Sequence, residues 1–376
     1  MTHYKMSDVA VEVNDRENNP ASSKYDRFVG LEHYVSGEVI IRNYGSTENL
    51  ESTMKIFQSG DVLVARRNVY LKRASMVDFD GLTSGDSIVL RAKNPVIGRI
   101  LPFVLNTDAF WDFADQYSDG TMSKRLSPKT LMTYEFDLPD EEELGKFADL
   151  LWAANDTRES YQALLRQTDE LVKSQFIELF KGGQYPVVKA KDVCHFITKG
   201  TTPKQDEIFT KPFDNSIPYL KVYNLSFNGE MLFFDEPQYI DRSVHEGKLA
   251  RSKVYPNDVL MNIVGPPLGK FALVNNDFDE WNINQAIAIF RAKKNIHPKF
   301  LLHALMQPDV LGPFLEQAQG VRQLNFSLEQ CRNLEFPLPS MVEQIAFVAV
   351  VEQTDKSKYY EQNRIFSVTR GGELCA

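Results

Sequence analysis

Glu135-Phe-Asp-Leu-Pro139 recurs as Glu335-Phe-Pro-Leu-Pro339, a shift of 200 residues, and Arg91-Ala-Lys93 recurs as Arg291-Ala-Lys293 at the same shift. Further matches keep this register or a register of 197: Gly120 with Gly320, Ser127 with Ser327, Glu143 with Glu343, Phe147 with Phe347, and Gly60-Asp-Val-Leu63 with Asn257-Asp-Val-Leu260. Each match is short, but so many matches at nearly one shift indicate a unit of about 200 residues that occurs twice.

The first part of each copy has the pattern of strands, turns and short helices. We expect hairpins with a glycine turn at 35–41 and 225–234, short apolar strands at 61–65 and 258–264, and helical pieces at 96–114 and 298–318. This mixture predicts an α+β recognition domain in each copy.

Beyond the Leu-Pro pairs at 138–139 and 338–339 the apolar residues change to alternating three- and four-residue steps. The first seam consists of Leu144, Phe147, Leu151, Ala154, Tyr161, Leu165, Thr168, Val172 and Leu179. The second consists of Phe347, Val351, Thr354, Ile365 and Val368. Both patterns are typical of coiled-coil helices, and Gly182-Gly183 is a suitable end for the first. Two unrelated surface helices are the alternative.

These patterns predict four segments: a globular domain at 1–139, a helix at 140–182, a second globular domain at 183–339, and a shorter helix with a tail at 340–376. The expected fold is α+β, with two globular domains separated by two long antiparallel coiled-coil helices in approximate two-fold symmetry.

The net charge of −9 is unevenly distributed along the 376 residues. Residues 140–182 carry ten acidic and five basic side chains, whereas 183–339 carry 17 of each. Because the large domains are near neutral, basic patches for DNA remain possible. No apolar run approaches the ~18 residues of a membrane span, and the N-terminus lacks an apolar signal core. Together with scattered Cys194, Cys331 and Cys375, these features predict a cytoplasmic protein without metal or disulfide sites.

Sequence motifs for catalysis are incomplete. Gly265-Pro-Pro-Leu-Gly-Lys270 superficially resembles a phosphate loop, but it is one residue short, lacks the following Ser or Thr, and loses two amide donors to proline. Asn94-Pro-Val-Ile lacks the aromatic residue of an adenine methyltransferase loop, and the six histidines show no metal or triad spacing. We therefore expect no catalytic residue, no metal and no cofactor.

Basic and amide side chains near the expected turns are the candidates for DNA contact, because arginine can pair with guanine and lysine, tyrosine or asparagine can hold phosphates and bases. In the first copy the candidates are Arg66, Arg67, Asn68, Tyr70, Lys72, Arg73, Lys124 and Arg125. In the second they are Lys199, Thr201, Thr202, Lys204, Asn262, Lys270, Asn284, Gln285, Arg322, Gln323 and Asn325. The alternatives are solvated hairpins with incidental charge and, for Asn284 and Gln285, buried turn amides.

At this point the residues resemble a known family. Arg27-Phe-Val-Gly-Leu-Glu-His33, Gly60-Asp-Val-Leu-Val-Ala-Arg-Arg67 and Tyr70-Leu71 are similar to a target-recognition domain of type I restriction–modification specificity subunits. A second such domain is suggested by Thr198-Lys-Gly-Thr-Thr-Pro203, Gly269-Lys270, Ile283-Asn-Gln285 and Leu338-Pro339 with Glu343-Gln344, and the distal spacer helix by Val351-Glu-Gln-Thr-Asp-Lys-Ser-Lys358.

The resemblance implies a non-catalytic reader of double-stranded DNA. Each domain would read one half of a bipartite target, and the helices would set the gap and dock methyltransferase subunits, two in number, which motor-nuclease subunits can join. The chain departs from the family pattern in its distal helix, which is short and leads into Arg370-Gly-Gly-Glu-Leu-Cys-Ala376. Different residues at equivalent loops, Arg66-Arg67 and Val264-Gly265, predict an asymmetric target. The alternatives are a coiled-coil scaffold with terminal protein-binding domains and, less well supported, an autonomous DNA-modifying enzyme.

Overall fold

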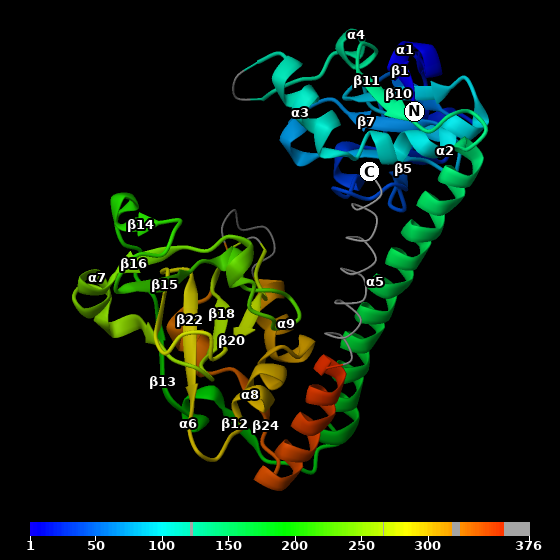
Figure 1. Cartoon of the computed structure of the whole chain (residues 1–376). Coiled ribbons are helices and arrows are strands. Elements are labelled where there is room, and N and C mark those ends of the chain that lie inside the picture. The colour runs from blue at the N-terminus through cyan, green and yellow to red at the C-terminus, as the bar shows by residue number, and fades with distance from the viewer. Residues whose placement is uncertain (121–122, 266, 318–323, 357–376) are drawn as a thin grey trace. The chain divides into compact units, whose positions relative to one another are not determined.

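The computed structural model describes residues 1–120, 123–265, 267–317 and 324–356 (Figure 1). The chain divides into two compact units, Met1–Glu159 and Ser160–Ala376. Helix α5, Leu144–Phe180, begins in the first unit and ends in the second. The α+β class with a long helix between two sheet-rich units is confirmed, whereas the symmetric placement of the domains and their predicted boundaries stay predictions. No helix in the described part of the chain is long and apolar enough to cross a membrane.

The first unit contains a two-stranded sheet β1-β11, a four-stranded sheet β2-β10-β7-β8 and a five-stranded sheet β3-β6-β9-β4-β5. Its strands are β1 (Thr2–Lys5), β2 (Ala10–Val13), β3 (Arg16–Glu17), β4 (Arg27–Val29), β5 (Gly45–Ser46), β6 (Met54–Phe57), β7 (Val62–Ala65), β8 (Ala74–Met76), β9 (Gly81–Thr83), β10 (Ser87–Ala92) and β11 (Glu135–Leu138). Its shorter helices are α1 (Met6–Val9), α2 (Pro95–Val104), α3 (Asp108–Tyr117) and α4 (Pro128–Leu131).

The second unit contains sheets β12-β24, β13-β22-β18-β20, β14-β16-β15-β21-β17 and β19-β23. Its strands are β12 (Val187–Lys189), β13 (Cys194–Lys199), β14 (Ile208–Phe209), β15 (Ser216–Leu220), β16 (Tyr239–Asp241), β17 (Lys253–Val254), β18 (Val259–Asn262), β19 (Val264–Gly265), β20 (Phe271–Leu273), β21 (Trp281–Ile283), β22 (Ile287–Ala292), β23 (Leu324–Asn325) and β24 (Glu335–Pro337). Its helices are α6 (Ala190–Val193), α7 (Arg242–Glu246), α8 (Pro298–Leu305), α9 (Pro308–Gln317) and α10 (Leu328–Arg332), together with a helix over 341–356.

The four-stranded sheets show that the repeat in sequence is a repeat of topology. In the first unit β2 and β8 flank the central antiparallel pair β10-β7. In the second unit the equivalent strands β13 and β20 flank the pair β22-β18. Alternate residues of a strand point to opposite faces. In β7, Val62 and Val64 therefore join the core formed with α2, whereas Leu63 joins the core formed with the five-stranded sheet. Both faces are covered, which explains the uninterrupted apolar run expected at 61–65.

The repeated charged residues are part of the framework. Arg91 donates from Nε and Nη2 to the two carboxylate oxygens of Asp61 at 2.7 Å each. Arg291 donates in the same way to Asp258, at 2.8 and 2.6 Å. Both aspartates are 2% exposed. A buried carboxylate requires such a partner, so these matches between the copies follow from folding and not from DNA contact.

The helix over 341–356 runs antiparallel to the second half of α5 (Figure 1). Phe347 packs edge-on against Phe176 and Phe180, with ring centroids 5.5 and 5.6 Å apart. Farther along the helix, Val351 lies with Val172 in the same core and beside the same cavity. The predicted pairing of the two helices is confirmed for these residues, whereas Ile365, Val368 and the tail lie outside the described residues.

Some local expectations were wrong and others were confirmed. The predicted seam places Ala154 and Leu179 inside, but both are exposed, and Phe176 and Phe180 take the buried positions of the last turns. The helical pieces expected at 96–114 and 298–318 are confirmed, as two helices in each range. Thr107 starts α3 by accepting a hydrogen bond from the Phe110 N–H, and Pro308 starts α9 because proline disfavours a helical residue before it.

Of the two expected hairpins, the first is wrong and the second forms. Gly37 forms a turn with a φ of 77°, but residues 35–41 make only one isolated parallel bridge, between Ile40 and Met76, so no hairpin forms there. In the second copy, Gly229 has a φ of 87° and the flanking residues Leu225 and Met231 form an isolated antiparallel bridge, which is a minimal hairpin.

Candidate nucleic-acid interface

In the first unit, three loops gather at one edge of the four-stranded sheet. Because the strands are antiparallel, the end of β7 and the starts of β8 and β10 share that edge. The Arg66 N–H donates to the carbonyl of Asp86 at 2.9 Å, and the Leu126 N–H donates to the carbonyl of Arg66 at 2.8 Å. Residues 66–73, 84–86 and 123–126, which are distant in sequence, therefore form one surface.

The exposed cations of this surface are paired with carboxylates. Asp86 accepts from Nη1 of Arg67 at 3.2 Å and from Nη2 of Arg125 at 3.1 Å. Lys72 pairs with Asp108, and Lys124 with Asp115, at 2.6 Å each. Hydrogen bonding and the positive charge of Lys72 lower the pKa of Asp108 below its usual value. The exposed pairs made by the two lysines are weak, so DNA phosphates can compete for Lys72 and Lys124.

Other candidates of the first copy shape the loop. Arg73 donates to the carbonyls of Leu31 and Arg67 at 3.0 and 3.1 Å, and the side-chain oxygen of Asn68 accepts from Ser123 at 3.0 Å. Asn68 and Lys72 adopt left-handed φ angles of 54° and 46° on either side of the short turn Val69–Leu71. Arg66 is half-buried. Arg73 and Asn68 thus stabilise the loop, and their DNA contacts stay predictions, whereas Tyr70 is 68% exposed.

The second unit brings together the equivalent segments. Strand β19, in the loop after β18, pairs with β23, so Val264 lies opposite Asn325. In the first unit the corresponding antiparallel bridge joins Arg67 and Arg125. Val264 follows Arg67 by 197 residues, and Asn325 follows Arg125 by 200 residues. The same two shifts relate the repeated framework residues. The same pair of segments therefore meets in both units with different side chains.

A further loop, 199–204, joins the same edge. It follows β13, whose last residue, Lys199, pairs with Ala288 of β22. A Cβ atom on Gly200 would lie 2.1 Å from the carbonyl oxygen of Asn284, so only glycine permits this close approach. The Gln285 N–H donates to Oγ1 of Thr202 at 3.4 Å. The predicted candidates in 199–204 and 284–285 are thus adjacent.

A model of the family described as the type I restriction modification DNA specificity domain matches residues 183–369. Residues 183–369 belong to this DNA specificity family. The Escherichia coli type I restriction enzyme EcoBI specificity subunit is 35% identical over 104 residues, which are 27% of this chain and 22% of that protein. The matched segment thus spans about a fifth of that curated relative.

Solved structures of the same kind also match the chain. The HsdS subunit of Thermoanaerobacter tengcongensis is 20% identical, with 97% of this chain and 91% of that chain covered and a TM-score of 0.39. The type I restriction-modification S subunit of M. genitalium is 13% identical, with 99% and 94% covered and a TM-score of 0.49.

Two amide candidates of the second copy, Asn262 and Asn284, form hydrogen bonds within the protein. Asn262 is fully buried: Nδ2 donates to the carbonyl of Pro267 at 2.8 Å, and Oδ1 accepts from the N–H of Lys270 at 2.7 Å. Its predicted role in DNA contact is corrected to closing the loop. Oδ1 of Asn284 accepts from the Ala286 N–H at 3.1 Å and stabilises the turn before β22.

Several second-copy candidates remain solvent-facing. These are Lys199, Thr202, Lys204, Gln285 and Asn325. Thr201 and Lys270 are half-buried, and Lys270 places its ammonium 5.7 Å from the ring centroid of Phe227. Arg322 and Gln323 lie outside the described residues.

Sequence reasoning missed Arg251. Its Nε and Nη2 donate to Oγ1 of Thr201 at 3.2 and 3.0 Å, which adds an exposed guanidinium to the surface. Arg251 is 50 residues away from Thr201 in the sequence, so no short motif could have predicted this contact.

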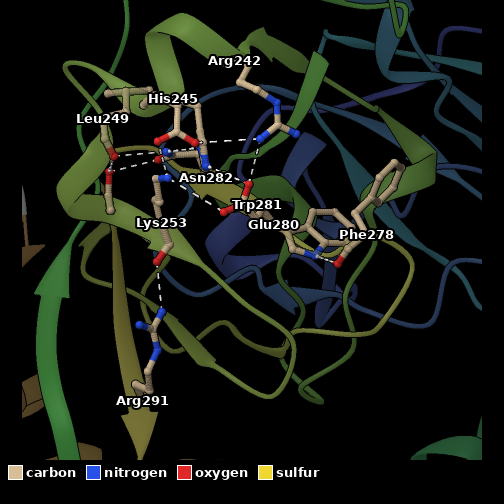
Figure 2. A network of polar contacts seen from close by, with 11 residues as sticks. Arg242, His245, Leu249, Lys253, Phe278, Glu280, Trp281, Asn282 and Arg291 are labelled. Carbon is tan, nitrogen blue, oxygen red and sulfur yellow. Dashed lines mark hydrogen bonds and ion pairs between the residues drawn. The ribbon is translucent and has the colours of Figure 1, made fainter. Parts of the chain in front are cut away.

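Among the described residues of the second unit, His245, Glu246 and Glu280 present possible metal-ligand atoms within 4.8 Å of one another. Figure 2 shows His245 and Glu280. Nδ1 of His245 lies 3.0 Å from Nδ2 of Asn282. The orientation of that amide is set by the Ile283 N–H, which donates to its oxygen, and by the carbonyl of Leu249, which accepts from its nitrogen. Nδ1 of His245 must therefore accept.

This hydrogen-bond pattern argues against a metal. If Nδ1 accepts, the neutral imidazole carries its hydrogen on Nε2, which then offers no lone pair to an ion. Burial also lowers the pKa of His245 and keeps the ring neutral. Lys253 and Arg242 already pair with the two glutamates, at 2.6 Å to Glu246 and 3.0 Å to Glu280 (Figure 2). The donor set fits a structural polar network better than a metal site.

The described cysteines, Cys194 and Cys331, are also poor reactive groups. Both are buried, and burial raises the pKa of each thiol to about 12. Their thiolates are therefore scarce at neutral pH.

Proposed function

We propose that this chain is the DNA-specificity subunit of a type I restriction–modification complex and reads an asymmetric, bipartite target. The observation that carries the proposal is the repeated sheet edge. Arg67 and Arg125 stand in the first unit where Val264 and Asn325 stand in the second. Two equal scaffolds with different side chains at the same place are what the reading of two different half-sites requires.

The chemistry of the two edges supports different base preferences. Arginine can pair bidentately with guanine in the major groove, and asparagine or glutamine with adenine. The first edge offers Arg67 and Arg125, and the second offers Gln285 and Asn325, all exposed. A mismatched base pair costs ~1–3 kcal/mol, so two reading units on one chain add their discrimination.

The helices are the proposed partner surface. Exposed apolar side chains lie along α5 and 341–356: Leu150, Leu164, Leu171, Val342 and Ile345. Large apolar side chains that are exposed on a helix can be buried when a partner protein binds there. We assign these helices to docking of methyltransferase subunits, two in number, with motor-nuclease subunits as further partners, in the cytoplasm. The chain itself contributes no catalytic group, and the methyltransferase subunits perform adenine methylation.

The test uses the full chain reconstituted with its methyltransferase partner. Methylome sequencing of cells with and without the chain gives the target, and gel shifts on that target measure selectivity. Arg67→Ala should weaken discrimination at one half-site by ~1–3 kcal/mol and leave the other unchanged. Arg42→Ala is the matched control, because Arg42 is a similarly exposed arginine, 54% against 45% for Arg67, that pairs with Asp78 and Glu159 away from this edge.

Absence of sequence-selective binding and of methylation in the reconstituted complex would contradict the proposal and favour the coiled-coil scaffold. Equal loss at both half-sites in Arg67→Ala would contradict the assignment of one unit to one half-site.

A further inference from the structure

Asp86 is held in place at the centre of the first edge. It lies in the turn between β9 and β10, where its N–H donates to Oγ of Ser84 at 3.3 Å and its carbonyl accepts from the N–H of Arg66 at 2.9 Å. The side chain is 28% exposed, and it contacts both Arg67 and Arg125. Hydrogen bonds therefore hold the backbone of Asp86 in place, and its carboxylate contacts the guanidinium groups of both arginines.

The backbone itself brings the two arginines together. Arg67 and Arg125 are directly opposite in an antiparallel bridge, which places their side chains on the same side. Like charges directly opposite are unfavourable in such a pair. One carboxylate that accepts from both arginines offsets this repulsion and restricts both side chains.

The contact with Asp86 leaves a recognition edge of Arg67 available. Arg67 uses Nη1 toward Asp86. One two-point edge of a guanidinium is formed by Nε and Nη2, as Arg91 shows with Asp61. Among the described residues, Nε and Nη2 of Arg67 have no hydrogen-bond partner, and the side chain is 45% exposed. Nε and Nη2 of Arg67 can therefore donate two hydrogen bonds to a guanine while Asp86 holds the guanidinium in its orientation.

The second unit supplies an internal comparison. At the positions equivalent to Arg67, Arg125 and Asp86 it has Val264, Asn325 and Ala286. The acid is thus present in the copy that has the arginines and absent from the copy that lacks them. An exposed ion pair without function is the simpler explanation for one contact, but it does not account for a carboxylate shared by two arginines at the reading edge.

We infer that Asp86 is a positioning residue for base recognition by the first unit: it orients Arg67 and Arg125 and so sets selectivity at one half-site. This inference rests on the proposed function. A carboxylate facing DNA repels phosphates, so Asp86 lowers general affinity while it raises selectivity. Immobilising the arginines before binding also reduces the entropy lost on complex formation.

The test compares Asp86→Ala with Asp78→Ala in the full chain bound to its methyltransferase partner. Alanine suits this turn, because Ala286 occupies it in the second unit. Asp78 also pairs with an arginine, Arg42, but at the far end of β8, so its replacement removes the same charge away from the reading edge. Binding is measured on the target, on targets altered in either half, and on unrelated DNA.

For Asp86→Ala we expect about tenfold weaker discrimination at one half-site, unchanged discrimination at the other, and equal or tighter binding to unrelated DNA. Asp78→Ala should leave both half-sites unchanged. Asp86→Glu should restore part of the selectivity, and adding Asp86→Ala to Arg67→Ala should cost less selectivity than Asp86→Ala does alone. A merely structural role would predict additive losses and a lowered melting temperature.

The outcomes separate the two proposals. If the unmodified complex shows no sequence selectivity, the proposed function is wrong. If it is selective and Asp86→Ala keeps its discrimination, or loses it equally in both halves, the role of Asp86 is wrong and the proposed function stands.

Discussion

Replacing Phe176 with alanine should separate the end of α5 from the helix over 341–356. The Phe176 ring is fully buried, and its centroid lies 5.2 Å from Phe180, 5.4 Å from Phe300 and 5.5 Å from Phe347. Truncation of a buried phenylalanine costs ~3–5 kcal/mol, because transfer energy is lost and a cavity remains. For a unit of this size we expect the melting temperature to fall by roughly 6–20 °C.

The matched control is Ile177→Ala, because Ile177 is the next residue of the helix and is 44% exposed. Thermal and denaturant unfolding followed by circular dichroism measures the change, which should affect the transition of the second unit, Ser160–Ala376. If Phe176→Ala destabilises the protein by less than ~1 kcal/mol, or no more than Ile177→Ala does, the aromatic cluster does not hold the helices together.

Two further predictions concern buried polar groups of the second unit. Asp258→Ala leaves Arg291 without its carboxylate and should cost ~3–5 kcal/mol in denaturant unfolding; a change near zero contradicts the framework role. Because the folded pKa of His245 is lowered from 6.5, the unfolded chain binds more protons in acid, so stability should fall as pH drops below about 6.5. His245→Gln should flatten this dependence of the unfolding free energy on pH, and an unchanged slope would show that other groups cause it.

The sequence was informative where the signal is local or repeated. The register of Asp61 and Arg91 with Asp258 and Arg291 predicted the duplication, and buried ion pairs explain why these residues recur. Helix α5 followed from its apolar steps and from Gly182-Gly183, with Gly183 at a φ of 78°. The exact seam did not follow, because three- and four-residue steps can be placed on more than one helical stripe.

The sequence alone determined that one scaffold is used twice, with different basic and polar residues at equivalent places in the loops of the two copies. Only the tertiary structure decided which of those side chains face solvent. Asn262 and Asn325 are the same residue type, yet one closes a loop inside the protein and the other lies on the surface. Likewise, Asp86 shows its place between Arg67 and Arg125 only after three distant segments meet at one sheet edge. Burial and orientation depend on such long-range contacts, which short motifs do not encode.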